Sequence, residues 1–110
     1  MKPSRTYQVL EYVSEEGKNP YRVWLDSLDT PVKARIQARV FRFESGNLGD
    51  YKPVGDGVWE AKFDFGPGYR VYFGIEGKMV ILLLLGGDKK SQRRDIQTAR
   101  RLWSDYLEGK

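Results

Sequence analysis

The side chains available for catalysis are restricted, because this chain has no histidine and no cysteine. Their absence removes the usual zinc ligands, the thiol nucleophile and every Ser-His-Asp or Cys-His arrangement. Any catalysis must therefore rest on Lys, Arg, Tyr, Asp, Glu or Gln side chains. Nothing in the sequence indicates a cofactor or a metal site.

One group of such side chains follows from the alternating pattern of residues 58–75. Successive side chains of a strand point to opposite faces, so alternate residues of two neighbouring strands gather on one face. The residues expected to share this exposed face are Glu60, Lys62, Asp64, Arg70 and Tyr72. Such a surface can bind an anionic ligand, or it is simply a solvated sheet face with cross-strand ion pairs.

A second group is the basic segment 88–101. The charges of its six cations and two carboxylates sum to +4, which equals the net charge of the whole chain. At the end of an apolar strand and the start of a helix, such side chains can hold phosphate together with helix N–H groups. The six cations are Lys89, Lys90, Arg93, Arg94, Arg100 and Arg101, and the two carboxylates are Asp88 and Asp95. A solvated helix face is the alternative.

A third group is the basic side of the segment that follows Thr30. Lys33, Arg35, Arg39 and Arg42 lie mostly off its apolar stripe and are suited to follow a phosphate backbone, unless they are only hydrated. The Gly-rich segment 46–57 lacks the G-x-x-x-x-G-K-S/T pattern, which excludes a nucleotide phosphate loop.

Hydrophobic periodicity predicts the elements that position these groups in the first half of the chain. Residues 6–13 are rich in β-branched and aromatic types and predict a strand. Asn19 and Pro20 are typical of a helix start, with an N-cap residue followed by proline. Thr30 and Pro31 show the same pattern and predict a second helix, which ends near Gly46. We expect the two helices to form a hairpin, and residues 46–57 to form a loop of turns.

The second half predicts three strands and a helix. Residues 58–65 and 69–75 alternate around a Gly66–Pro67–Gly68 turn, and the apolar run 78–85 fits a central strand. Ser91 can cap a last helix, whose apolar stripe is Ile96, Ala99, Leu102, Trp103 and Tyr106. Trp24, Trp59 and Trp103 are expected in the core. The predicted fold is α+β, in the order β-α-α-β-β-β-α.

The length of 110 residues fits one domain with one core. The N-terminus lacks the apolar stretch of a signal peptide, and the longest apolar run, Met79–Leu85, is too short to span a bilayer. We therefore expect a soluble, cytoplasmic protein.

Two stretches carry a resemblance to a known family. They are V-W-E-A-K-F-D-F-G-P-G-Y-R-V-Y-F at 58–73 and G-G-D-K-K-S-Q-R-R-D-I at 86–96. With the element order and the N-P and T-P helix starts, they resemble the toxins of plasmid addiction modules in the RelE/ParE-like superfamily, close to its HigB branch. The resemblance implies a RelE-like fold, in which a small, largely antiparallel sheet packs against helices and leaves an RNA-binding groove on its open side.

The same resemblance implies an activity and partners. Related toxins mostly cut mRNA, often on the ribosome, and a cognate antitoxin neutralises them; here a DNA-binding helix-turn-helix antitoxin is implied. The family's functional arginine falls on Arg70, its lysine pair on Lys89 and Lys90, and a strand position that is often basic on Lys62. The implied function is that of an mRNA interferase, an endoribonuclease that inhibits translation.

The residues can support metal-independent RNA cleavage, in which a 2′-hydroxyl attacks the adjacent phosphorus. Arg70 is the candidate for stabilising the phosphate, and Lys62, Lys89, Lys90 and Glu60 are the candidate bases. Tyr72 can stack on a base or orient the substrate, and Gln92 can hydrogen-bond a base edge. The further RNA-binding candidates are Arg93, Arg94, Lys33, Arg35 and Arg39.

Two alternatives stay open. Members of the superfamily that poison DNA gyrase share the fold without being nucleases, since fold alone does not fix function. A decayed or repurposed binding module would keep the fold but would tolerate the loss of Arg70 and Lys89.

Overall fold

The computed structural model describes residues 6–78 and 80–109; Met79, in the predicted apolar strand, lies outside the described residues. The elements follow the order β1 (Gln8–Glu11), α1 (Pro20–Asp26), α2 (Thr30–Arg42), the 3-10 helix η1 (Phe43–Ser45), β2 (Tyr51–Gly55), β3 (Val58–Lys62), β4 (Arg70–Glu76), β5 (Val80–Gly87) and α3 (Gln92–Glu108). None of the helices in the described part combines the length and the apolar character that a bilayer crossing needs.

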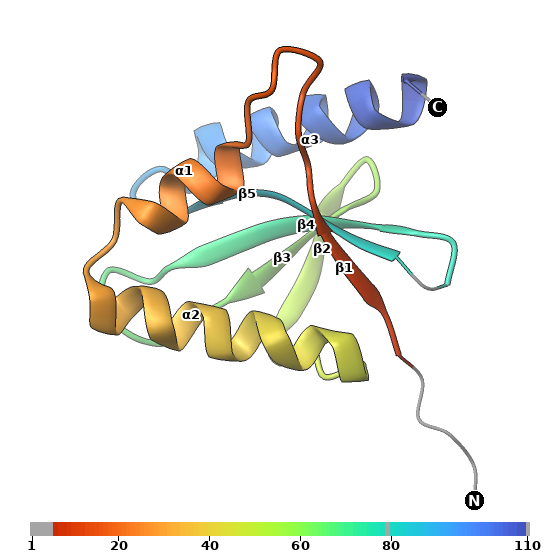
Figure 1. Ribbon diagram of the computed structural model, residues 1–110. Helices are drawn as coiled ribbons and strands as arrows, with labels where there is room; N and C mark the ends of the chain where they lie inside the picture. Colours follow the sequence, from red (N-terminus) through yellow and green to blue (C-terminus); the bar gives the residue numbers. More distant parts are fainter. Residues whose placement is uncertain (1–5, 79, 110) are drawn as a thin grey trace, which may run out of the picture.

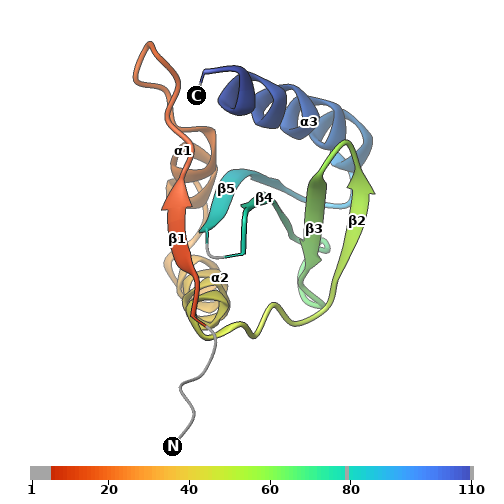
Figure 2. The ribbon, with the colours of Figure 1, turned by 90° about the vertical axis from the view of Figure 1, so that its right-hand side faces the viewer.

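The five strands form one sheet in the order β1-β5-β4-β3-β2. β1 pairs with β5 in parallel, and the other three pairs are antiparallel. Figure 1 shows α2 and α3 on opposite sides of this sheet, and Figure 2 shows β1 and β2 at its two edges. The predicted α+β class with a largely antiparallel sheet is confirmed.

The strand β2 corrects the prediction that residues 46–57 form only a loop. Tyr51–Gly55 pairs with β3 across a tight turn in which Asp56 and Gly57 have positive φ angles of 54° and 84°. The strand lies at the sheet edge, and most of its side chains are exposed. Pro53 is tolerated there because an edge strand can lose a ladder hydrogen bond. Because the strand is mostly exposed and contains a proline, its sequence lacks the alternation of apolar and polar residues that the other strands show.

The two predicted helix starts are confirmed with one shift. The Asn19 side chain accepts a hydrogen bond from the Arg22 N–H at 2.9 Å, and Pro20 opens α1. In α2 the N-cap is Asp29, so the prediction of Thr30 as the cap was wrong by one residue. The predicted helix hairpin is not the main contact of α1, which packs chiefly on β5.

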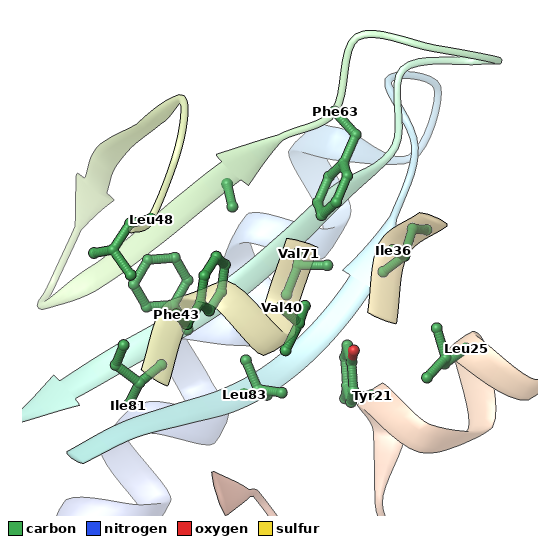
Figure 3. Close-up of a cluster of buried hydrophobic side chains, with 12 residues drawn as sticks. Tyr21, Leu25, Ile36, Val40, Phe43, Leu48, Phe63, Val71, Ile81 and Leu83 are labelled. Carbon is green, nitrogen blue, oxygen red and sulfur yellow. The ribbon is translucent and has the colours of Figure 1, made fainter. Parts of the chain in front are cut away.

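One core fills the space between the sheet and the helices α1 and α2. Figure 3 shows side chains of α1, α2, η1 and the adjoining loops meeting those of the strands: Tyr21, Leu25, Ile36, Val40, Phe43, Leu48, Phe63, Val71, Ile81 and Leu83. Each fully buried side chain of this size contributes about 1.5–3 kcal/mol through the hydrophobic effect. Trp24 and Trp59 pack against this cluster and are partly buried, so their predicted core position is confirmed only in part.

A second core lies on the other face of the sheet, beneath α3. Its members are Tyr12, Val58, Tyr72, Leu82, Leu84, Ala99, Leu102 and Trp103. The predicted apolar stripe of α3 therefore meets the sheet, and Trp103 is buried as expected. The expectation of a single core is therefore wrong, and a sheet with a core on each face has less open surface than the sequence suggested.

Candidate nucleic-acid interface

The predicted exposed face of β3 and β4 is in fact mostly buried. Glu60 pairs with Tyr72, and Lys62 with Arg70, in the strand register, so the prediction that they share one face is confirmed. However, only 1% of Glu60, 6% of Arg70 and none of Tyr72 is exposed, because α3 covers this face. Lys62 and Asp64 remain exposed. The prediction was wrong because it left α3 without a surface for its apolar stripe.

The Glu60 carboxylate lies at the centre of the buried polar group. Gln92 at the start of α3 donates a hydrogen bond from Nε2 to Glu60 Oε2 at 2.8 Å. Arg70 Nε lies 3.8 Å from Oε2, and Lys52 Nζ lies 4.0 Å from Oε1. Glu60 thus connects the two strands β2 and β4 with the first turn of α3. Lys52 was missed by the sequence reasoning because it falls in the segment predicted as loop.

Arg70 is buried with few acceptors around it. Its Nη1 donates to the Gly68 carbonyl oxygen, whereas its buried Nε has no hydrogen-bond acceptor among the described residues. A Cβ placed on Gly68 would lie 2.9 Å from Arg70 Nη1 and 3.5 Å from Lys89 Cβ. The turn 66–68 therefore lies against the guanidinium, and Lys89 packs on the same turn, where its N–H donates to the Pro67 carbonyl oxygen at 3.3 Å.

The Tyr72 hydroxyl is a second buried donor at this site. The side chain is fully buried, so the predicted stacking of Tyr72 on an RNA base is wrong. Burial, and then the charge of the Glu60 carboxylate and a hydrogen bond to it, raise the pKa of Tyr72 well above its ordinary value. The hydroxyl therefore stays protonated and can donate to Glu60. Arg70 Nε is then the buried donor of this site that lacks a hydrogen-bond acceptor among the described residues.

The start of α3 is held by a serine and two aspartates. Ser91 occupies the N-cap position, but the predicted side-chain cap is wrong: its Oγ contacts the buried Asp95 carboxylate at 2.5 Å instead of a helix N–H. The Ser91 N–H donates to Asp88 Oδ1 at 3.1 Å. A Cβ on Gly87 would overlap Asp95 Oδ2, so glycine is required for this close approach. These contacts were not predicted, because they depend on how α3 meets β5.

Exposed cations surround the buried group. The side chains of Lys89, Lys90, Arg93 and Arg94 are exposed, and none has a carboxylate within ion-pairing distance among residues 6–78 and 80–109. Lys52 and Lys62 add two more cations, with 66% and 48% of their side chains exposed. The first turn of α3 and the adjoining strand ends thus form a positively charged rim, which attracts polyanions.

The basic residues of α2 do not join this rim. Lys33 forms an ion pair with Asp26 at 2.6 Å. Arg39 donates to the carbonyl oxygens of Leu48, Asp50 and Lys62. Arg35 lies over the Phe65 ring. The helix covers the face of the sheet opposite to α3.

The fold and site define a small, basic α+β protein with a cationic rim around a buried Glu–Arg pair. Residues 23–104 match the family described as Phage derived protein Gp49-like (DUF891). The chain is also 45% identical over 80 residues to a protein of Haemophilus influenzae described only as an uncharacterized protein, covering 72% of this chain and 81% of the relative. The chain belongs to the Gp49-like family, which is associated with toxin–antitoxin modules.

Proposed function

We propose that this chain is the toxin of a type II toxin–antitoxin module of the RelE/HigB kind, and that it is a metal-independent mRNA endoribonuclease. In this proposal residues 1–110 form one toxin domain, which acts in the cytoplasm on mRNA at the ribosome. A cognate antitoxin, a DNA-binding helix-turn-helix protein, neutralises it. Membership of the Gp49-like family supports the toxin–antitoxin context.

The observation that carries the nuclease proposal is the group of exposed cations at the start of α3, next to the turn that lies against Arg70: Lys89, Lys90, Arg93 and Arg94. None of these four has a carboxylate within ion-pairing distance among the described residues. Unpaired cations of this kind are suited to bind the successive phosphates of an RNA chain, and a guanidinium forms strong hydrogen bonds with phosphate.

The roles of the charged residues follow from their exposure. Arg70 stabilises the charge that develops on the phosphate as the 2′-hydroxyl attacks, and removing it lowers the rate on the order of 10²-fold. Glu60 is 1% exposed and is therefore a positioning residue for Arg70 instead of the base. Lys89 is exposed and lies beside Arg70 across the 66–68 turn, so it is the base we favour over Lys62 and Lys90.

The experiment compares purified wild type with two lysine variants. Lys89→Ala removes the proposed base, and Lys18→Ala removes an exposed lysine from the loop before α1, far along the chain from the site. Each protein is incubated with mRNA in a translating extract, and with purified mRNA in the presence of EDTA. The proposal expects site-specific cuts by wild type and Lys18→Ala, and a loss of at least about 10²-fold in Lys89→Ala.

The opposite result would also be informative. Intact mRNA in every reaction, together with growth arrest of cells that express the wild type, would refute the nuclease proposal. Inhibition of DNA gyrase would then become the leading activity. Equal cutting by Lys89→Ala and wild type would remove Lys89 from the base role and leave Lys62 and Lys90 to be tested in the same way.

A further inference from the structure

The turn after β3 has a second side that carries aromatic rings. Phe65 and Tyr69 contact each other at 5.4 Å between ring centroids, and Tyr69 meets Trp24 of α1 edge-on at 6.3 Å. All three rings are partly exposed at the margin of the core beneath α1 and α2. Large aromatic rings that remain partly exposed next to a cationic surface are suited to stacking on nucleic-acid bases.

A cation completes this aromatic surface. The Arg35 guanidinium carbon lies 3.7 Å from the centroid of the Phe65 ring. Arg35 is exposed, and the described residues place no carboxylate within ion-pairing distance of it. Arginine planes and aromatic rings are the surfaces on which unpaired RNA bases stack, and the charge of Arg35 also favours the phosphate next to such a base.

The aromatic surface and the proposed catalytic site share one turn. Tyr69 directly precedes Arg70 in the chain, and the Pro67 carbonyl oxygen accepts a hydrogen bond from the Lys89 N–H at 3.3 Å. On the other side, Trp24 packs so closely on Gly86 of β5 that a Cβ there would overlap the indole. Tyr69 and the proposed phosphate position at Arg70 and Lys89 therefore lie at the two sides of the same turn.

We propose that Arg35, Phe65 and Tyr69 form a stacking platform for an unpaired base of single-stranded RNA that flanks the phosphate held at Arg70. The inference deepens the proposed function and rests on it for the position of that phosphate. The platform raises the affinity for single-stranded RNA only where a base is present to stack on it. A phosphate without a base gains no affinity from the platform. A base-paired strand cannot use it, because its bases are stacked on each other.

The test uses a non-cleavable single-stranded oligonucleotide that carries a 2′-deoxy residue at the cut position. Affinity is measured by fluorescence anisotropy for this oligonucleotide and for a series in which one nucleotide at a time is abasic. Phe65→Leu removes the ring but keeps an apolar side chain, and Arg35→Ala removes the cation. The matched controls on α2 are Phe41→Leu, whose ring is 73% exposed and lies beside β1 and η1, and Arg42→Ala.

The platform predicts a coupling between one base and one ring. One abasic position should weaken binding to wild type and to both controls by roughly 5- to 100-fold, and should have little further effect on Phe65→Leu or Arg35→Ala. Circular dichroism and the thermal midpoint verify that each variant is folded. Arg35→Ala keeps the test valid if Phe65→Leu proves unstable.

The outcomes separate the platform from the nuclease. Additive effects of the abasic position and of both variants, in a wild type that cleaves mRNA, would overturn the platform and leave the nuclease intact. Coupling in a wild type that binds but never cleaves would support the platform and remove the nuclease. A wild type that binds no single-stranded RNA at all overturns both.

Discussion

Gln92 and Glu60 are separated by 32 positions, yet the Gln92 amide donates to the Glu60 carboxylate at 2.8 Å. This bond attaches the first turn of α3 to the middle of strand β3, next to Arg70. Because Glu60 is almost fully buried, the bond also replaces part of the hydration that the carboxylate loses on folding. The bond is one of the contacts that hold the cationic rim beside Arg70, together with the apolar stripe of α3 on the sheet.

Replacing Gln92 by alanine tests this attachment. The change leaves one oxygen of a buried carboxylate without its donor, so we expect the free energy of unfolding to fall by about 1–3 kcal/mol. Urea unfolding measures it. Gln97→Ala, at an exposed position of the same helix, is the control and should change stability by less than about 0.5 kcal/mol. Equal effects of the two substitutions would show that the Gln92–Glu60 bond contributes nothing to stability.

The buried ion pair of Glu60 and Arg70 gives a second prediction. Arg70→Met leaves the Glu60 carboxylate with the Lys52 ammonium as its cation, and that side chain is largely exposed, so we expect a loss of about 3–5 kcal/mol in unfolding free energy. The double variant Glu60→Met/Arg70→Met removes both charges and should regain much of that loss, because no uncompensated charge stays buried. Additive losses in a double-mutant cycle would contradict the coupling.

Most of the fold could be predicted from the sequence, because periodicity depends on local rules. The Asn19–Pro20 start of α1 and the apolar stripe of α3 appear where the pattern indicates them. β2 could not be found in this way, because an exposed edge strand with a proline has no alternation to read. The parallel pairing of β1 with β5 joins distant segments, and no local signal encodes it.

The sequence correctly predicted which residues share the face of the candidate site, but it did not predict that this face is buried. Strand alternation was enough to place Glu60, Lys62, Arg70 and Tyr72 on one face. Whether that face is open depends on where α3 packs, which is a property of the whole sheet. The two leucines Leu82 and Leu84 in β5 were the available signal, because a strand that is apolar on both faces needs a cover on each.

Arg39 is the subject of a third prediction. Its guanidinium donates to Leu48 at 3.3 Å, to Asp50 at 2.9 Å and to Lys62, and it lies 4.3 Å from the centroid of the Phe63 ring. Arg39→Met removes the donor that joins the loop at Leu48 and Asp50 to the end of β3. The Asp50 oxygen keeps the Lys62 N–H as a donor, and water can reach the exposed oxygens, so the unfolding free energy should fall by about 0.5–1.5 kcal/mol. Arg42→Met removes the same charge from the exposed side of α2 and is the control. Similar thermal melts for the two variants would refute a structural role of Arg39.

The pH dependence of stability is the fourth prediction, and it centres on Glu11. Burial opposes ionisation of this carboxyl, but hydrogen bonds from Arg22 and Asn19 outweigh it, so the pKa of Glu11 lies below its ordinary value of 4.5. A pKa that is lower in the folded state means that the unfolded state binds the proton more readily. The resulting stability is therefore complete above pH 4.5 and is lost as the pH falls through the lowered value.

Urea unfolding of wild type and Glu11→Gln at pH 7, 4.5 and 3 measures this contribution. The difference in unfolding free energy between them should be largest at pH 7 and should shrink as the pH falls below 4.5, because the wild-type carboxyl then becomes as neutral as the amide. Glu15→Gln, in the exposed loop before α1, controls for the loss of one negative charge and should follow wild type at every pH. A Glu11→Gln difference that stays constant from pH 7 to 3 would mean that packing, and not the ion pair with Arg22, accounts for the effect of the substitution.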